Sequence, residues 1–205
     1  MKLSPQVKAV FYMIVIMWLI FAADQLLPYD FTQFGIEPRT KKGLIGIIFA
    51  PFLHDSLQNI AYETIPLFIL SMVLAVSYPK RAIMSWLLIY ITSGAIVWLF
   101  TRKIVVYTGS SYLILGLIGF LIIYGFSRRS VGSILISTGI LALYIAYLYG
   151  IIPKSERYPW ESHVFGLLSG AFWGYIFGKK DRQKVLLRKA GVIRKEDKND
   201  DNEQQ

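Results

Sequence analysis

Six long apolar segments constrain the fold of this chain more than any other feature of its sequence. They cover about residues 7–27, 57–78, 82–100, 111–126, 132–152 and 160–178, and charged residues or prolines separate them. A bilayer core about 30 Å thick needs roughly 20 mostly apolar residues in each crossing helix. The segments follow one another with short charged links and carry no amphipathic stripe, which is typical of membrane spans. The sequence therefore predicts an all-α integral membrane protein with six transmembrane helices.

Composition supports this prediction and excludes several classes of function. The chain of 205 residues is 55% hydrophobic and only 17% charged, so an ordinary water-soluble domain is excluded. It has no cysteine and only two histidines, His54 and His163. A zinc site usually needs three or four protein ligands drawn largely from these two residue types. We therefore expect neither a metal nor a cofactor.

The chain divides into a membrane domain and a tail. Residues 1–178 hold the six expected spans, and a link over residues 28–56 carries an apolar stretch, 43–53, that is too short to cross a bilayer. We interpret this stretch as an interfacial or partly inserted element. Residues 179–205 are first basic and then polar, which is typical of a juxtamembrane segment followed by a disordered tail.

The distribution of charge predicts the orientation. With the N-terminus inside, fifteen of the 22 Lys and Arg residues fall on the inner side. The two short inner loops contain no acidic residue, whereas the outer links contain Asp30, Glu37, Asp55 and Glu156. We therefore expect a multi-pass protein of the cell membrane with both termini in the cytoplasm. Topology and attraction to anionic lipids then explain the net charge of +9, so nucleic acid is not an expected partner.

Four polar residues lie inside the expected spans, where polar groups are costly and often functional. Asn59 and Glu63 lie in the second span, Ser111 begins the fourth and His163 lies one turn into the sixth. Even-numbered spans all run from outside to inside, so the four residues share one depth near the outer face. A neutral imidazole can take the proton of a serine hydroxyl, and an amide or a backbone N–H at a helix N-terminus can stabilise an oxyanion.

Structural alternatives exist for each of these residues. A serine at a helix start often serves as the N-cap, and a membrane histidine often has only a packing role. Glycines favour the catalytic interpretation, because Gly109, Gly116 and Gly119 lie in or near the fourth span and Gly166, Gly170 and Gly174 recur at four-residue spacing in the sixth. Packing through such faces lets helices approach closely and would bring Ser111 and His163 within hydrogen-bond reach.

Taken together, these motifs resemble those of the rhomboid family of intramembrane serine proteases. Gly109-Ser110-Ser111 is similar to the Gly-x-Ser motif that begins the fourth rhomboid helix, and His163 with Gly166 resembles the motif of the sixth. The stretch APFLHDSLQNIAYETIPLFIL, which contains His54, is similar to the family's second-helix region. The resemblance covers roughly residues 35–178.

The resemblance implies a six-helix rhomboid-like bundle with a Ser-His dyad. Ser111 would be the nucleophile, His163 its base and later its acid, and Asn59 with the backbone N–H of Ser111 would form the oxyanion site. Gly109 and Gly166 would be the motif glycines. The expected partners are transmembrane protein substrates, cleaved near the outer membrane face, and the lipid bilayer.

Four positions depart from the family pattern. Asn59 and Glu63 stand where most rhomboids have a histidine and an asparagine, and Tyr112 and Leu115 replace a glycine and an aromatic residue. An ionised Glu63 offers only acceptors and would repel an oxyanion, unless it is protonated or faces another partner such as a lysine. We therefore treat Glu63 as a modulator of the site.

Two other functions stay open. A non-proteolytic rhomboid-like protein that binds transmembrane partners would account for the departures. A small transporter or channel would use Glu63, Glu161 and His163 as an ion path. No obvious internal repeat supports the transporter hypothesis.

Overall fold

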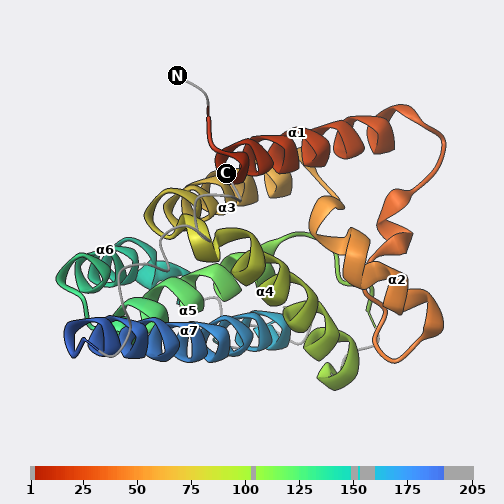
Figure 1. Ribbon diagram of the computed structural model, residues 1–205. Helices are drawn as coiled ribbons and strands as arrows, with labels where there is room; N and C mark the ends of the chain where they lie inside the picture. The colour runs from red at the N-terminus through yellow and green to blue at the C-terminus, as the bar shows by residue number, and fades with distance from the viewer. Residues whose placement is uncertain (1–2, 103–104, 149–151, 153–159, 192–205) are drawn as a thin grey trace.

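Seven α-helices make up most of the described part of the chain (Figure 1). The computed structural model describes residues 3–102, 105–148, 152 and 160–191. The helices are α1 (Pro5–Leu26), α2 (Lys41–Phe49), α3 (Leu57–Ser77), α4 (Pro79–Phe100), α5 (Ser111–Arg128), α6 (Val131–Leu148) and α7 (Trp160–Lys189). The short 3₁₀ helices η1 (Phe31–Phe34) and η2 (Ala50–Phe52) lie in the link between α1 and α3. The all-α fold expected from the sequence is thus confirmed.

The expected spans coincide with helices of the structure. Among the described residues, α1, α3, α4, α5 and α6 are each long and apolar enough to cross a membrane. The sixth expected span, 160–178, is the first part of the 30-residue helix α7, in which polar residues follow the apolar stretch and make the helix as a whole less hydrophobic. The end of the fifth expected span, 149–151, and the polar tail, 192–205, lie outside the described residues.

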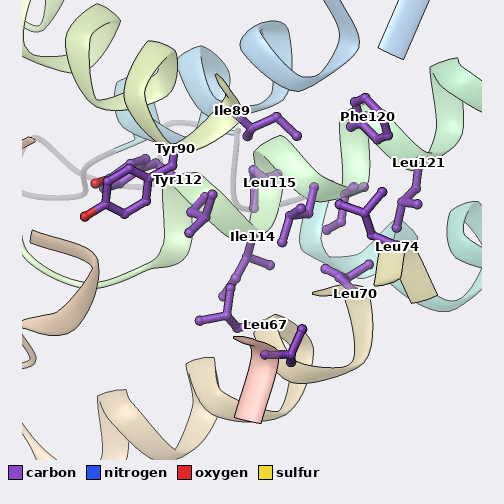
Figure 2. Packing of buried hydrophobic residues seen from close by; sticks show 14 of the residues in the cluster. Leu67, Leu70, Leu74, Ile89, Tyr90, Tyr112, Ile114, Leu115, Phe120 and Leu121 are labelled. Carbon is purple, nitrogen blue, oxygen red and sulfur yellow. The ribbon is translucent and has the colours of Figure 1, made fainter. Parts of the chain in front are cut away.

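Helix α5 forms the centre of the bundle and packs against α3, α4, α6 and α7 (Figures 1 and 2). In the most apolar stretch of α5, 67% of the residues are buried inside the protein, compared with 17% for α1 and 22% for α6. The outer helices keep large apolar side chains on their surface, including Leu19 of α1 and Leu143 of α6. An apolar surface of this kind suits lipid contact rather than water.

The α5 and α7 helices run parallel and touch backbone to backbone. Glycines of α7 at four-residue spacing face backbone atoms of α5. Gly166 lies against Tyr112, and Gly170 lies against Gly116, so closely that an added Cβ would overlap the opposite carbonyl group. The same offset continues to Gly174 and Gly178. The close glycine packing expected for the fourth and sixth spans is therefore confirmed.

The link between α1 and α3 packs against the loop that leads into α5. Ile36 and Tyr107 exchange backbone hydrogen bonds of 2.8 Å in both directions. Arg39 donates its side-chain Nη1 to the carbonyl of Thr101 at 2.8 Å, which ties the same link to the end of α4. The stretch 43–53, expected to be interfacial or partly inserted, forms most of α2 and all of η2. The residues just before α2 hold the segment that precedes α5.

The glycine contact between α5 and α7 leads to a stability prediction. We expect Gly170→Ala to lower the free energy of unfolding by about 1–3 kcal/mol, because a methyl group there forces the two backbones apart. Gly139→Ala in α6 is the matched control, since no atom lies within 4 Å of its added Cβ. The control should be neutral, or stabilising by up to about 1 kcal/mol. Denaturant unfolding in detergent micelles measures both, and equal effects would contradict the packing argument.

Candidate active site

The turn before α5 has a backbone shape that favours glycine. Gly109 adopts a φ of +89°, in the left-handed region where a side chain is strained. Its N–H lies between two acceptors, the carbonyl of Ala50 at 2.9 Å and that of Leu53 at 2.7 Å. A Cβ at this position would lie 3.1 Å from both carboxylate oxygens of Glu63. The first motif glycine therefore sets the entry of the chain into α5.

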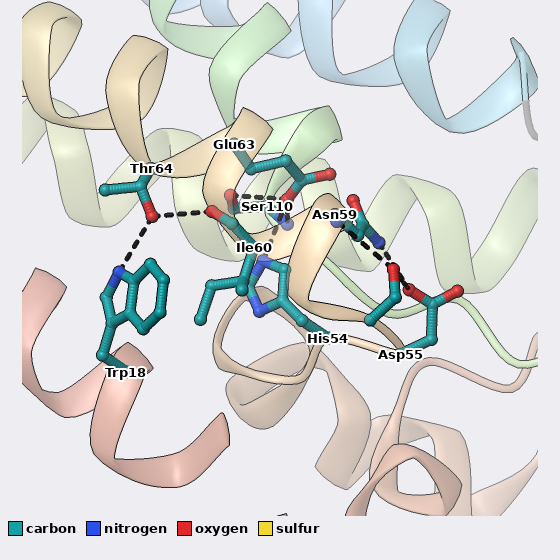
Figure 3. Close-up of polar contacts among 9 residues, drawn as sticks. Trp18, His54, Asp55, Asn59, Ile60, Glu63, Thr64 and Ser110 are labelled. Carbon is teal, nitrogen blue, oxygen red and sulfur yellow. Dashed lines mark hydrogen bonds and ion pairs between the residues drawn. The ribbon is translucent and has the colours of Figure 1, made fainter. Parts of the chain in front are cut away.

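Glu63 of α3 holds the same turn from the other side (Figure 3). Its Oε2 accepts hydrogen bonds from the backbone N–H of Ser110 and from the Ser110 hydroxyl, the latter at 2.8 Å. The same oxygen lies 3.1 Å from Nε2 of His54. Ser110 and His54 are buried, and the Glu63 side chain is only 12% exposed. We call His54, Glu63 and Ser110 the Glu63 network.

The hydrogen-bond partners of the Glu63 carboxylate differ from the lysine considered above. They are Ser110 and His54. A carboxylate offers acceptor sites only, and here three donors converge on one of its oxygens. From the sequence, an ionised Glu63 was expected to repel an oxyanion. In the structure, Glu63 positions the turn that carries Ser111.

Ser111 is the first residue of α5 and is partly buried. Its hydroxyl makes no hydrogen bond to another described residue. Ser110, not Ser111, occupies the N-cap position, so the alternative interpretation of Ser111 as the N-cap is wrong. The first N–H groups of a helix have no partner within the helix and form a positive end. Ser111 thus combines a hydroxyl that has no hydrogen-bond partner among the described residues with backbone donors suited to an anion.

His163 lies in the first turn of α7 and is 8% exposed. Gly166, one turn further, packs on the backbone of Tyr112, so His163 and Ser111 lie at the same end of the α5–α7 pair. No hydrogen bond joins the two side chains in the part of the chain that the structure describes. Catalytic hydrogen bonds are often long before substrate binds. The dyad therefore stays a prediction.

Asn59 lies at the start of α3, where its side chain has a local partner (Figure 3). Its Nδ2 donates to Oδ1 of Asp55 at 3.0 Å, and its backbone N–H donates to the Ser56 hydroxyl. A primary amide has two N–H donors, so one remains beyond the bond to Asp55. The oxyanion role of Asn59 also stays a prediction.

Sequence reasoning missed the part that Ser110 and His54 play. His54 was seen only as part of a motif, and Ser110 only as the middle residue of Gly-x-Ser. A signal existed in principle, because a carboxylate inside a span needs donors and Ser110 lies beside the expected nucleophile. Nothing in the spacing indicates that these residues meet, since 47 positions separate Glu63 from Ser110.

Comparisons with known proteins bear on the same residues. The rhomboid domain family model matches residues 41–180, which include the Glu63 network, Ser111 and His163. An uncharacterized protein of Mycobacterium tuberculosis is 28% identical over 187 residues, covering 87% of this chain and 78% of its own length. An uncharacterized protein of Mycobacterium leprae is 30% identical over 191 residues, covering 86% of this chain and 73% of its own length.

The Glu63 network leads to a prediction about local order. We expect Glu63→Gln to lower the free energy of unfolding by about 1–3 kcal/mol, because a neutral amide oxygen accepts the three hydrogen bonds at Oε2 more weakly than a charged carboxylate oxygen does. Hydrogen–deuterium exchange of residues 107–113 should become faster. Glu37→Gln is the matched control, because the Glu37 carboxylate forms no hydrogen bond with another described residue. Unchanged exchange in the Glu63 variant would contradict the positioning role.

Proposed function

The chain belongs to the rhomboid family, and from that premise we propose that it is an intramembrane serine endopeptidase. Its substrates would be transmembrane proteins, cut near the outer face of the cell membrane. Ser111 would attack the scissile carbonyl, and His163 would take its proton. The observation that carries the proposal is the Ser111 hydroxyl, which is unused by capping and lies at the N-terminus of the central helix.

The reaction would proceed in two steps. Attack by the Ser111 oxygen forms a tetrahedral oxyanion, which the backbone N–H of Ser111 and the side chain of Asn59 would stabilise. His163 then gives the proton to the leaving amine and an acyl-enzyme forms. A water molecule, deprotonated by His163, attacks the acyl carbon, the bond to the Ser111 oxygen breaks, and His163 returns the proton to Ser111 as the new carboxyl terminus leaves. Neither step requires a metal or a cofactor.

The packing of α5 on α7 supports the pairing of Ser111 with His163. Their helices run parallel at a fixed offset, and the glycine contacts leave little freedom to slide. A side chain one turn before Gly166 therefore keeps its level relative to the start of α5. Small movements of the His163 side chain, rather than of the helices, would close the hydrogen bond when substrate binds.

The nucleophile is tested by one substitution. We expect Ser111→Ala to abolish both the cleavage of a transmembrane substrate in proteoliposomes and labelling by a fluorophosphonate probe. Ser127→Ala makes the same change near the other end of α5 and should leave both intact. Equal cleavage by the wild type and by Ser111→Ala would remove the proposal.

The base is tested with the two histidines of the chain. His163→Gln should reduce cleavage by about 10³-fold or more, because the serine then keeps its proton. His54→Gln is the matched control, since a glutamine amide can still donate to Glu63. We expect the control to keep most fluorophosphonate labelling. Comparable labelling of Ser111 in both variants would rule out His163 as the base.

A second candidate is a non-proteolytic rhomboid-like protein that binds transmembrane partners. The bond between Asn59 and Asp55 favours it, because it engages the amide expected at the oxyanion site. Stable binding of a transmembrane partner without turnover or fluorophosphonate labelling would support this candidate. An ion path is less well supported, since Glu63 binds Ser110 and His54 whereas Glu161 accepts the backbone N–H of Arg102.

A further inference from the structure

A polar cavity of about 540 Å³ lies at the end of the bundle away from Ser111. Its walls come from the end of α3, the start of α4, the end of α5 and the last turns of α7. Ser111 begins α5 and Arg128 ends it, so the two sites are about 25 Å apart along the helix. The cavity is therefore separate from the candidate active site.

Basic side chains dominate the lining of this cavity. Among the described residues, the lining includes the carboxylate of Asp181 and the cations Lys80, Arg81, Arg128, Lys184 and Arg188. A volume of 540 Å³ falls within the usual range for small-molecule sites. The cavity therefore has room for an anion larger than a single water molecule.

The single carboxylate already has partners. Arg81 donates to Asp181 through Nε at 3.0 Å and through Nη2, and the Tyr124 hydroxyl donates at 2.8 Å. Burial opposes the ionisation of Asp181, but the hydrogen bonds from Arg81 and Tyr124 outweigh it and hold its pKa below the ordinary value. Asp181 thus neutralises Arg81 and serves as the scaffold of the cavity.

Arg128 is held in place by its neighbours. Its guanidinium lies over the rings of Tyr78 and Tyr124, 5.8 Å and 5.9 Å from their centroids. Its Nε is buried and has no hydrogen-bond partner among the described residues. Lys184 and Arg188, one turn apart on α7, form no ion pair with another described residue. Among the described residues, Asp181 forms an ion pair with Arg81, and Arg128 acts on Asp181 only through its charge.

We propose that this cavity binds a phosphate group, carried by an anionic lipid headgroup or by free phosphate. Phosphate offers several acceptor oxygens, and arginine side chains match them with planar pairs of donors. The position supports the proposal, because the charge pattern of the loops predicts this end of the bundle at the cytoplasmic leaflet. Basic pockets between helices at that level suit phosphorylated headgroups.

The test uses the full chain in maltoside micelles and three probes. Dioleoyl phosphatidic acid carries the phosphate on a lipid, inorganic phosphate carries it alone, and dioleoyl phosphatidylcholine is the zwitterionic comparison. The rise of the thermal unfolding midpoint with probe concentration gives an apparent affinity. We expect phosphatidic acid, inorganic phosphate or both to raise the midpoint, and phosphatidylcholine not to.

The double variant Lys184→Gln/Arg188→Gln assigns the binding to the cavity. We expect it to weaken binding of the active probe by about tenfold or more. The control Lys180→Gln/Arg182→Gln removes the same charge from the same helix at residues that do not line the cavity, and it should stay within about twofold of the wild type.

The outcomes distinguish a lipid headgroup from free phosphate, and two of them would overturn the proposal. A response to phosphatidic acid alone identifies the lipid headgroup, and a response to inorganic phosphate shows that the free anion suffices. No response to either probe would overturn the proposal. Equal loss of binding in both double variants would overturn it too, because the anion would then respond to the diffuse surface charge of α7.

Discussion

The direct backbone contact between α5 and α7 is the constraint on which the rest of the structure depends. Gly166, Gly170 and Gly174 place α7 against the carbonyl face of α5 with no side chains between them. Lipid supplies no hydrophobic force that would hold two apolar helices together, so close packing must supply the attraction. The same contact fixes the level of every residue on α7 relative to α5, including His163 and Asp181.

Two clusters of polar side chains lie at opposite ends of the central helix, and each is centred on a buried or half-buried carboxylate. At the start of α5, Glu63 forms hydrogen bonds with Ser110 and His54. At the end of α5, Asp181 accepts hydrogen bonds from Arg81 and Tyr124. An unpaired charge inside a membrane protein is costly, so each carboxylate collects several donors from different helices. Each group thereby ties segments far apart in the sequence to the ends of α5.

The sequence predicted the helices and the glycine contact well, because both follow from local patterns. Long apolar runs coincide with helices, although α7 continues to Lys189 beyond the expected end at residue 178, and four-residue glycine spacing indicated the face of α7. It did not predict the partners of Glu63, because a carboxylate and its donors lie on different segments and no periodicity connects them. The bond between Arg81 and Asp181 joins residues 100 positions apart, which no local pattern encodes. Polar contacts across a bundle depend on the rotation of each helix, and the apolar pattern of a lipid-facing helix leaves that rotation open.

Glu63 and Ser110 are best understood as one structural unit. A neutral amide at position 63 could place its one acceptor oxygen at the same point, but without the negative charge that strengthens the bonds from Ser110 and His54. A carboxylate can accept all three bonds, so a glutamate at this position requires donors near the turn and the Ser110 hydroxyl supplies one. The departure from the family pattern at position 63 is thus matched by the serine that precedes Ser111. What changes is the way in which the turn is held, while the hydroxyl of Ser111, the first residue of α5, forms no hydrogen bond with any other residue that the structure describes.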